Sequence, residues 1–296
     1  MPNNDVADNG ANEAPTIWRD LTQAELDAQY DQTTLVPNAP DYMARWAETS
    51  AGMRAQRPPA ALRYGEGDDE TLYLYPGRPG GPVHMHVHGG AWRALTRDDA
   101  GFVVHGLAAE GATVAVLNFS LVPDATLHTV VAQVRRAALF LRRHVEGAER
   151  LFVSGHSSGA HLATCLLDDA WQADAGLPRE AFAGFVLVSG PYDLEPVRLS
   201  ARNSYLNLSP ADADLLSPIR RLTAPFPQID LFWGENELDE FKRQSRALAA
   251  VVAGAGAAVE LPNQNHFDMY DAFGEANSLI VRAALTQMRA EPELTP

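Results

Sequence analysis

The chain has 296 residues, of which 46% are hydrophobic and 21% charged, and its formal net charge at pH 7 is −15. A charge of this sign disfavours nucleic acid and anionic membrane surfaces as partners. No apolar run approaches the roughly 20 residues of a membrane-spanning helix, whereas the hydrophobic content is sufficient for the core of one large α/β domain.

The first part of the chain is expected to be a tail followed by helices. Residues 1–16 are polar, acidic and rich in small side chains, and they lack the basic and apolar regions of a signal peptide, so we expect a disordered tail. Residues 17–296 are expected to form a single domain, in which 17–60 is a helical extension that partly caps the rest. Helices are expected at 21–29 and 42–56.

Further along the chain, segments with strand character alternate with helical ones. Such alternation predicts a parallel sheet covered by helices on both faces. The segment 192–227 is expected to be rich in loops. The expected strands are 71–75, 82–87, 113–117, 151–154, 184–189, 229–233 and 258–261, and the expected helices are 100–110, 128–145, 160–167, 241–253 and one at the C-terminal end.

The strand expected at 82–87 is followed by the sequence HGGAW at 88–92. Glycines leave backbone N–H groups accessible because no Cβ blocks the approach, and acyl transfer requires such groups to hold the oxygen that becomes negative. Gly89 and Gly90 are therefore candidate oxyanion-hole donors. A glycine pair after a strand is also compatible with a simple tight turn.

Residues 155–159 read GHSSG, a G-x-S-x-G pattern between an expected strand and an expected helix. In that context the central serine stands on a strained turn, clear of the sheet, where it acts as a nucleophile. The candidate nucleophile is Ser157, and the natural second oxyanion donor is the N–H group of Ser158. The single cysteine, Cys165, lies two turns into the following helix and is expected to be packed there.

A base and an acid are expected near the end of the chain. His266 opens a loop after the strand 258–261, and imidazole is the side chain that exchanges a proton near neutral pH. The acid is expected in the loop after the strand 229–233. That loop offers four carboxylates, from Glu235, Glu237, Asp239 and Glu240.

Other histidines and aromatic residues lie beside these motifs. A metal array is an alternative for three histidines that alternate along one strand, but packed histidines are favoured there: His84, His86 and His88. His161 is expected at the helix surface or in support of the site. Three residues that flank the motifs are candidate substrate contacts: Trp92, His156 and Phe267.

Together the motifs resemble the kynurenine formamidase (arylformamidase) branch of the α/β-hydrolase superfamily, the group with an HGG-x-W oxyanion segment. The resemblance runs from about Trp18 to the last helix and includes SGPYDLEP at 189–196, WGENE at 233–237 and NHFD at 265–268. It implies an α/β-hydrolase fold, with a mostly parallel central sheet, helices on both faces and an N-terminal helical extension. The chain order serine, acid, histidine agrees with that fold.

The resemblance also implies the members of a catalytic triad. The family usually places an aspartate three residues after the glycine of the acid loop, and this position is Glu237 here. The implied triad is therefore Ser157, His266 and Glu237, with Asp239 the runner-up as the acid and Glu235 less favoured. Ala91 stands where the family often has an aromatic residue, a change that would widen the pocket beside the oxyanion hole.

The activity implied is hydrolysis of a formyl amide of an aromatic amine, such as N-formylkynurenine, without a nucleotide, flavin or metal cofactor. The alternatives are a short-chain carboxylesterase, an amide hydrolase of another catabolic pathway and a non-catalytic ligand-binding protein on the same scaffold. The single cysteine excludes an internal disulfide and is compatible with a reducing cytoplasm. The sequence carries no signal for the oligomeric state, and a homodimer is an assumption.

Overall fold

The computed structural model describes residues 14–289, and the centre of this part is one eight-stranded sheet. Its strand order is β10-β9-β8-β7-β5-β6-β4-β3. Neighbouring strands from β10 to β6 run parallel, whereas β4 is antiparallel to β6 and β3 is antiparallel to β4. The strands are β3 (Ala60–Arg63), β4 (Thr71–Tyr75), β5 (Val83–Val87), β6 (Thr113–Leu117), β7 (Leu151–His156), β8 (Phe182–Val188), β9 (Gln228–Gly234) and β10 (Ala258–Leu261).

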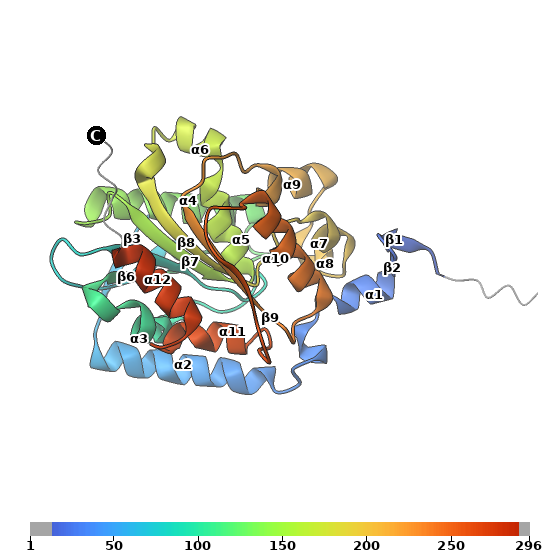
Figure 1. The fold of residues 1–296 in the computed structure, drawn as a ribbon, viewed down its shortest axis with the longest axis horizontal. Coiled ribbons are helices and arrows are strands. Elements are labelled where there is room, and N and C mark those ends of the chain that lie inside the picture. The colour runs from blue at the N-terminus through green and yellow to red at the C-terminus, as the bar shows by residue number, and fades with distance from the viewer. Residues whose placement is uncertain (1–13, 290–296) are drawn as a thin grey trace, which may run out of the picture.

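Helices cover both faces of this sheet (Figure 1), as the alternation of strands and helices predicts. One face is covered by α2 (Ala39–Gln56), α3 (Val104–Leu107), α11 (Asp268–Asp271) and α12 (Leu279–Arg289). The other face is covered by α4 (Leu127–His144), α5 (Ser158–Thr164) and α10 (Asp239–Val251).

The side chains of a central strand alternate between the two layers of the core. In β6, Val114 and Val116 pack with the cluster on the α2 side, and Ala115 and Leu117 pack with the cluster on the α4 side. Because both faces are buried there, the strand is apolar from Val114 to Leu117. This continuous apolar run explains why the sequence predicts the bounds of β6 without error, and β4 and β10 also have their predicted bounds.

The helix expected at 100–110 is broken into short pieces. The 3-10 helix η2 (Gly101–Val103) precedes α3, and a further 3-10 turn, η3 (Ala109–Gly111), follows it. Glu110 and Gly111 have φ values of 64° and 79°, which no right-handed helix contains. The expectation of one continuous helix was wrong because the apolar pattern does not reveal this backbone turn.

The loop-rich segment expected at 192–227 contains three short α-helices and the 3-10 helix η6 (Pro218–Arg220). The α-helices are α7 (Glu195–Leu199), α8 (Asn203–Leu206) and α9 (Pro210–Leu215). The start of α9 is fixed by a capping box between Ser209 and Asp212. These helices are short enough for local turn chemistry to define them, so hydrophobic periodicity does not predict them.

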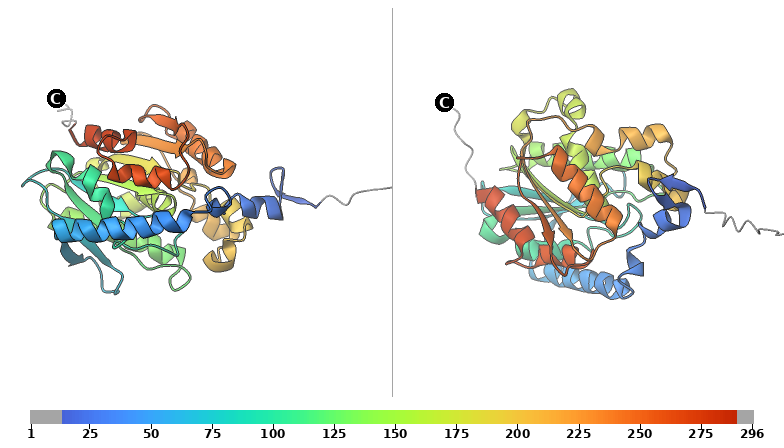
Figure 2. Two further views of the ribbon diagram at one scale, coloured as in Figure 1. Left: turned by 90° about the horizontal axis from the view of Figure 1, so that it is seen from below. Right: turned by 45° about the vertical axis from the view of Figure 1, so that its right-hand side comes forward.

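The N-terminal segment packs against these short helices. The strands β1 (Thr16–Trp18) and β2 (Leu21–Thr22) pair with each other and lead into α1 (Gln23–Ala28). Gln23 Nε2 donates to the Leu199 carbonyl at 2.9 Å, which holds α1 beside α7. Figures 1 and 2 show this segment at one end of the molecule, joined to the long α2. Of the tail expected at 1–16, residues 1–13 lie outside the described part, and Thr16 belongs to β1.

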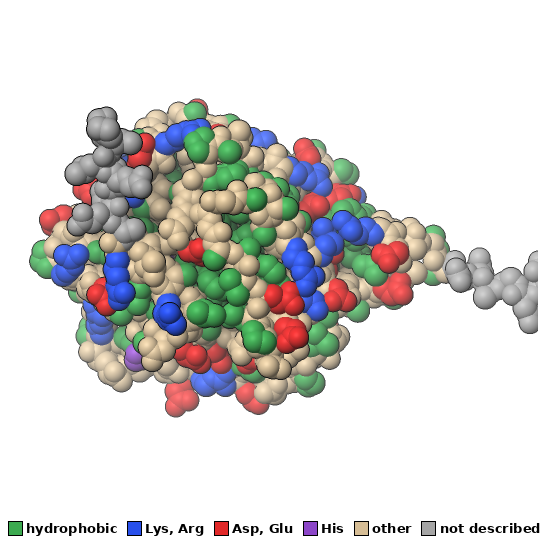
Figure 3. Space-filling model, in the orientation of Figure 1, with side chains coloured by type: hydrophobic (Ala, Val, Ile, Leu, Met, Phe, Trp, Pro, Cys, Tyr) green, Lys and Arg blue, Asp and Glu red, His purple; other side chains and the backbone are tan. Residues whose placement is uncertain are grey.

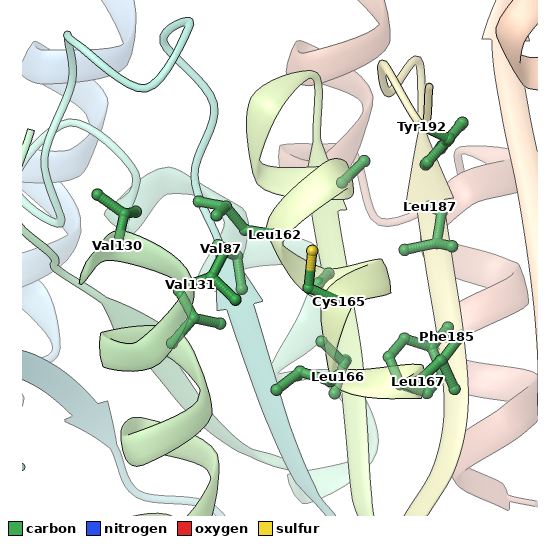
Figure 4. Close-up of a cluster of buried hydrophobic side chains, with 14 of the residues drawn as sticks. Val87, Val130, Val131, Leu162, Cys165, Leu166, Leu167, Phe185, Leu187 and Tyr192 are labelled. Atoms are coloured by element: carbon green, nitrogen blue, oxygen red, sulfur yellow. The ribbon is translucent and has the colours of Figure 1, made fainter. Parts of the chain in front are cut away.

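Cys165 is packed in the core, as expected. Figure 4 shows it directly after α5, among Leu162, Leu166 and Leu187. Burial raises the pKa of its thiol to about 12, so the thiolate is scarce at neutral pH. The structure therefore gives this cysteine a packing role.

The surface carries acidic and basic side chains intermixed on the face seen in Figure 3. Ion pairs such as those of Arg246 with Glu260 and Arg45 with Asp271 neutralise part of the acidic charge of the chain. In the part of the chain that the structure describes, every helix is too short or too polar to cross a membrane.

Candidate active site

Ser157 stands on a sharp turn between β7 and α5. Its φ and ψ are 54° and −126°, a region that side-chain-bearing residues occupy only under strain. The strand ends at His156, the helix begins at Ser158, and the Ser157 N–H group donates to the Val188 carbonyl at 2.8 Å. This is the strand–turn–helix geometry that the G-x-S-x-G pattern predicts.

Two glycines allow the backbones at this turn to approach closely. A Cβ on Gly155 would lie 2.4 Å from the Gly159 carbonyl oxygen, and a Cβ on Gly159 would lie 2.2 Å from the Val87 carbonyl oxygen. Both distances are far below van der Waals contact, so no larger residue fits either position. The glycines of the pattern therefore pack α5 against β5 and β7.

The glycine pair 89–90 lies beside this turn. A Cβ on Gly89 would lie 3.4 Å from the Cβ of Ser157, and a Cβ on Gly90 would lie 2.0 Å from the Ala94 carbonyl oxygen. Gly90 also has a φ of 101°, which favours glycine. The backbone of the HGGAW segment is thus brought directly against the serine.

A hydrogen bond joins the HGGAW segment to the start of α5. The Trp92 N–H group donates to Ser158 Oγ at 3.2 Å. Because Ser158 is the first residue of α5, its own N–H group lies at the helix N-terminus, where backbone N–H groups point outward. The three predicted oxyanion donors, Gly89, Gly90 and Ser158, therefore come from two segments that contact each other.

His266 and Glu237 form a buried pair. His266 Nδ1 donates to Glu237 Oε2 at 3.0 Å, and the two side chains are 7% and 0% exposed. The other oxygen, Oε1, accepts from Ser189 Oγ at 2.5 Å and from the Gly234 N–H group at 2.8 Å. With Nδ1 protonated, Nε2 of the neutral ring is free to accept a proton.

The other carboxylates of the acid loop lie elsewhere. Asp239 forms an ion pair with Lys242 at 2.9 Å, and its side chain is 86% exposed. Glu235 Oε2 accepts from the Asn263 N–H group at the surface. Of the carboxylates considered in this loop, Glu237 is the one that the structure brings to His266.

A cavity of about 470 Å³ lies at the serine and the histidine. Ser157 and His266 line it together, beside Gly90 and Ala91 of the HGGAW segment. Its remaining walls come from the N-terminal segment, α2 and the α7–α8 region, and they include Tyr30, Gln32, Met43, Trp46, Arg202 and Tyr205. No local motif marks these wall residues, because they reach the cavity only through packing of distant segments.

Two of the candidate substrate contacts line this cavity, and the third does not. His156 and Phe267 are lining residues. Trp92 is fully buried, and its indole N–H group donates to His161 Nδ1 at 3.2 Å. The expected contact of Trp92 with substrate was wrong because the positive φ of this residue, 61°, turns its side chain into the core.

His161 is also buried, so its expected place at the helix surface was wrong. It accepts from Trp92 and donates from Nε2 to the Leu216 carbonyl at 2.8 Å. Burial lowers its pKa to about 4, which keeps the ring neutral at physiological pH. His161 therefore supports the site, as the alternative expectation had it, by linking the HGGAW segment to the residue that follows α9.

His156 holds the backbone of His266 in place through a hydrogen bond. Its Nε2 donates to the His266 backbone carbonyl at 2.9 Å, and its ring stacks on Tyr270 with centroids 4.7 Å apart. Burial holds the pKa of His156 well below its usual range, and the neighbouring His266 lowers it further. A neutral ring here adds no charge that would oppose protonation of His266.

The alternating histidines of β5 belong to a buried hydrogen-bond network. His84 Nε2 and His86 Nδ1 both lie within 2.8 Å of Ser154 Oγ, and His86 Nε2 lies 3.2 Å from the Tyr270 hydroxyl. Burial lowers the pKa of His84 to about 3. Among residues 14–289, no group of three or more His, Cys, Asp or Glu side chains is arranged to hold a metal ion.

Comparison with known sequences finds similar hydrolases along the chain. The family model BD-FAE matches residues 72–173. Kynurenine formamidases of Danio rerio and Salmo salar are 28% and 26% identical, over 90% and 92% of this chain and over 97% and 98% of their own lengths. Esterase LipQ of Mycobacterium tuberculosis is 28% identical over 86% of this chain and 65% of its own length.

Comparison with solved structures finds the same fold. A putative thioesterase from Silicibacter sp. superposes with a TM-score of 0.80 at 24% identity, covering 88% of this chain and 99% of that chain. An esterase from Pyrobaculum calidifontis gives a TM-score of 0.64 at 18% identity, covering 88% and 94%. With the mostly parallel sheet flanked by helices, these likenesses identify the α/β-hydrolase fold.

Proposed function

The chain is a kynurenine formamidase-like hydrolase of the α/β-hydrolase superfamily, and we propose that it cleaves aryl formamides with Ser157, His266 and Glu237 as its catalytic triad. One observation carries the proposal. A histidine held by a buried carboxylate shares a cavity with a serine on a strained turn. That is the arrangement by which hydrolases activate a weak nucleophile.

The proposed reaction is a two-step acyl transfer. His266 Nε2 takes the hydroxyl proton of Ser157 as Oγ attacks the formyl carbon, and Glu237 stabilises the imidazolium that forms. His266 then protonates the departing amine, which leaves a formyl ester on Ser157. Water, deprotonated by the same histidine, attacks this ester and releases formate, and the serine regains its proton.

We assign the oxyanion hole to the backbone N–H groups of Gly89, Gly90 and Ser158. Support comes from the closeness of Gly89 to Ser157 and from the hydrogen bond between Trp92 and Ser158, which holds the two segments in register. Each well-placed donor of this kind contributes about 3 kcal/mol to transition-state stabilisation in other hydrolases.

The cavity suits a small acyl group and an aromatic leaving group. Gly90 and Ala91 form the wall beside Ser157, and neither carries a long side chain. Aromatic rings occupy other walls, and among them Trp46 stacks on Phe267 with centroids 6.0 Å apart. A flat aryl amine would bury its ring against such surfaces.

The N-terminal segment 17–60 acts, in this proposal, as a partial cap. Tyr30, Gln32 and Thr33 line the cavity from the stretch after α1, and Met43 and Trp46 line it from α2. A cap of this kind excludes water from the reacting centre, which strengthens electrostatic interactions there. The segment therefore contributes to the substrate pocket as well as to the fold.

A short-chain carboxylesterase is the second candidate function. The likeness to esterase LipQ and to isoprenylcysteine methylesterases favours it. Esters are easier to cleave than amides because an alkoxide or phenoxide is the better leaving group, so ester turnover is expected for either function. The non-catalytic alternative loses support because the serine, the histidine and the carboxylate all line or adjoin one cavity.

The deciding experiment compares kcat/KM for N-formylkynurenine and for p-nitrophenyl acetate. We expect a value for the formamide within the range of enzymes acting on their own substrates, about 10⁴–10⁸ M⁻¹s⁻¹. Ester turnover with a negligible formamide rate would instead assign the chain to the esterases or to amidases of another pathway. Ser157→Ala is the matched control, and it should abolish both activities.

We further propose that the enzyme works in a reducing compartment, the cytoplasm, on a small-molecule substrate and without nucleic acid. The single cysteine, buried directly after α5, supports a fold independent of disulfides. A homodimer is the proposed oligomeric form, and light scattering coupled to size exclusion measures it directly. A mass of about 32 kDa, that of one chain, would contradict it.

A further inference from the structure

His156, the residue before the nucleophile, has one ring nitrogen engaged by the protein and the other free to accept a hydrogen bond. Nε2 donates to the His266 backbone carbonyl at 2.9 Å, so Nε2 carries the ring proton. Burial holds the pKa of this histidine well below its usual range, so the ring is neutral at pH 7 and Nδ1 keeps its lone pair. A contact with the backbone therefore fixes Nδ1 as an acceptor.

Nδ1 of His156 faces the substrate cavity without a partner. No donor among residues 14–289 forms a hydrogen bond with it. Nδ1 of His84 and Nε2 of His88 also lack partners, but those atoms are sealed in the core. Nδ1 of His156 is not among the sealed atoms, and the residue lines the cavity. A molecule bound in the cavity can therefore reach this nitrogen.

The same nitrogen lies beside the groups that carry out acyl transfer. A Cβ on Gly89 would lie 3.2 Å from Nδ1 of His156 and 3.4 Å from Cβ of Ser157, so Nδ1 adjoins both the oxyanion segment and the nucleophile. The rings of His156 and His266 have centroids 4.6 Å apart. A leaving group on the carbon that Ser157 attacks therefore lies close to both imidazoles.

Support of the histidine loop accounts for Nε2 of His156 but not for Nδ1. The His266 carbonyl requires one donor, and the stacking on Tyr270 requires only a flat ring. Neither contact uses Nδ1. An unpaired acceptor in a buried side chain costs free energy, which a donor on the substrate would recover.

Amides and esters differ in the hydrogen that the leaving atom carries. The nitrogen of an anilide has one hydrogen, and its lone pair must face His266 to take the proton that His266 received from Ser157. An acceptor on the other side of the nitrogen binds the N–H group and directs the lone pair to His266. An ester oxygen has no hydrogen and gains nothing from that acceptor.

We propose that Nδ1 of His156 accepts the N–H group of the scissile amide in the transition state. The C–N bond breaks as His266 Nε2 gives its proton to the nitrogen, and the amine leaves with both hydrogens. His156 itself neither gives nor takes a proton. This inference rests on the proposed function for the identity of the leaving group. It adds the residue that favours amides over esters in a site that attacks both.

The first test separates the two nitrogens of the ring by substitution. In His156→Gln the amide nitrogen is as many bonds from the backbone as Nε2, whereas in His156→Asn the amide oxygen is as many bonds away as Nδ1. The substrates are p-nitroformanilide and p-nitrophenyl formate, with spontaneous ester hydrolysis subtracted. His156→Gln should lower kcat/KM for the anilide by about 10- to 100-fold, chiefly through kcat, and leave the ester within about threefold of wild type.

His156→Asn should lower both rates, because the His266 carbonyl loses its donor, and keep the anilide-to-ester ratio within about threefold of wild type. Tyr270→Phe is the control: it keeps a ring against His156 and should keep the ratio as well. Circular dichroism verifies the fold of each variant. Equal losses for anilide and ester in His156→Gln would overturn the inference, since His156 would then serve only to hold the histidine loop.

A second measurement separates this inference from the proposed function. The anilide and the phenyl monoester of methylphosphonic acid are tetrahedral anions that differ only in N–H against oxygen, and both are used as competitive inhibitors of p-nitrophenyl acetate hydrolysis. This measurement requires no amide turnover. The anilide should bind the wild type about 10-fold more tightly, and His156→Gln should lose that preference. Equal inhibition of the wild type would overturn the contact while leaving the formamidase assignment in place. A preference of the expected size in an enzyme that cleaves no formamide would support the contact and overturn only the assignment.

Discussion

Ser189 donates its hydroxyl to Oε1 of Glu237 across 2.5 Å, and this contact determines which carboxylate oxygen faces His266. The Gly234 N–H group binds the same Oε1 from the end of β9. With Oε1 held twice, Oε2 is directed to Nδ1 of the imidazole. The glutamate side chain reaches His266 with one oxygen because its far oxygen is anchored in this way.

The first prediction concerns the charge of that carboxylate. Glu237→Gln should lower kcat by about 10³- to 10⁴-fold, because a neutral amide neither stabilises the imidazolium nor enforces the reactive tautomer. The measurement is kcat for p-nitrophenyl acetate with the fold verified by circular dichroism. Asp239→Asn is the matched control, and its exposed side chain predicts a near wild-type rate. If Asp239→Asn lost most of its kcat and Glu237→Gln did not, the triad acid would be Asp239 instead.

The second prediction assigns a positioning role to Ser189. Ser189→Ala removes one hydrogen bond to a charged group, and kcat should fall about 10-fold while KM stays nearly constant. Ser245→Ala is the control, since that buried hydroxyl has no hydrogen-bond partner among the described residues. Equal rate losses in the two variants would mean that the effect comes from packing rather than from the carboxylate.

The extent to which the sequence predicts this site depends on how local each signal is. Ser157 and His266 follow from motifs of five residues or fewer beside strands, and the structure brings both to one cavity. Position 237 required a family resemblance, because four carboxylates in that loop are equivalent by composition. The bounds of β6 were predicted without error, whereas the equally buried β7 was predicted two residues too short at its C-terminal end, where the glycine and histidine of the GHSSG motif interrupt the apolar run.

Other parts were beyond prediction for a physical reason. Ser189 contacts Glu237 and Arg202 contacts Tyr30, each far away in the sequence, and no periodicity records such contacts. Trp92 is buried through a positive φ that a tryptophan rarely adopts. Its place next to the glycine pair suggested instead that its side chain faces the substrate. The edge strand β3 is short and mostly exposed, and it therefore lacks the apolar pattern of the central strands.

The third prediction separates stability from activity at the nucleophile. Ser157 has a φ of 54° and a ψ of −126°, a conformation that glycine adopts without strain. Ser157→Gly should therefore be more stable than Ser157→Ala by about 1 kcal/mol in urea unfolding, although both variants are inactive. Ala132→Gly on the exposed side of α4 is the control, and it should destabilise by about 1 kcal/mol. Equal stabilities at position 157 would mean that the turn stores no strain.

The fourth prediction concerns pH. Burial lowers the pKa values of five histidines; the folded values are about 3 for His84 and about 4 for His88 and His161, and those of His86 and His156 lie well below the usual range. Unfolded histidines titrate near pH 6.5, so below that pH the unfolded state binds more protons than the folded state. The contribution of these histidines to the free energy of unfolding is therefore fully present above about pH 6.5. It is lost as the pH falls towards their pKa values in the folded state.

The size of this effect follows from proton linkage. Each histidine contributes a slope of about 1.4 kcal/mol per pH unit once the unfolded form is fully protonated. Urea unfolding between about pH 7.5 and 5.5 measures the combined slope. His105→Gln, at an exposed position, is the control and should leave the slope intact. A stability that stays flat over this interval would contradict neutral burial of these rings.

The fifth prediction tests the link between the two oxyanion segments. Ser158 Oγ accepts from the Trp92 N–H group, and both Ala91 and Trp92 have positive φ values, so the segment depends on outside contacts to keep its shape. Ser158→Ala removes the acceptor but keeps the backbone N–H group of residue 158. We expect kcat to fall about 10-fold with little change in KM, because the loss falls on groups that act in the transition state. Thr164→Val, on the same helix, loses only a bond to the Ala160 carbonyl and should keep its rate. If Ser158→Ala retained wild-type kcat, the segment would hold its geometry without this hydrogen bond, and the contact would serve packing alone.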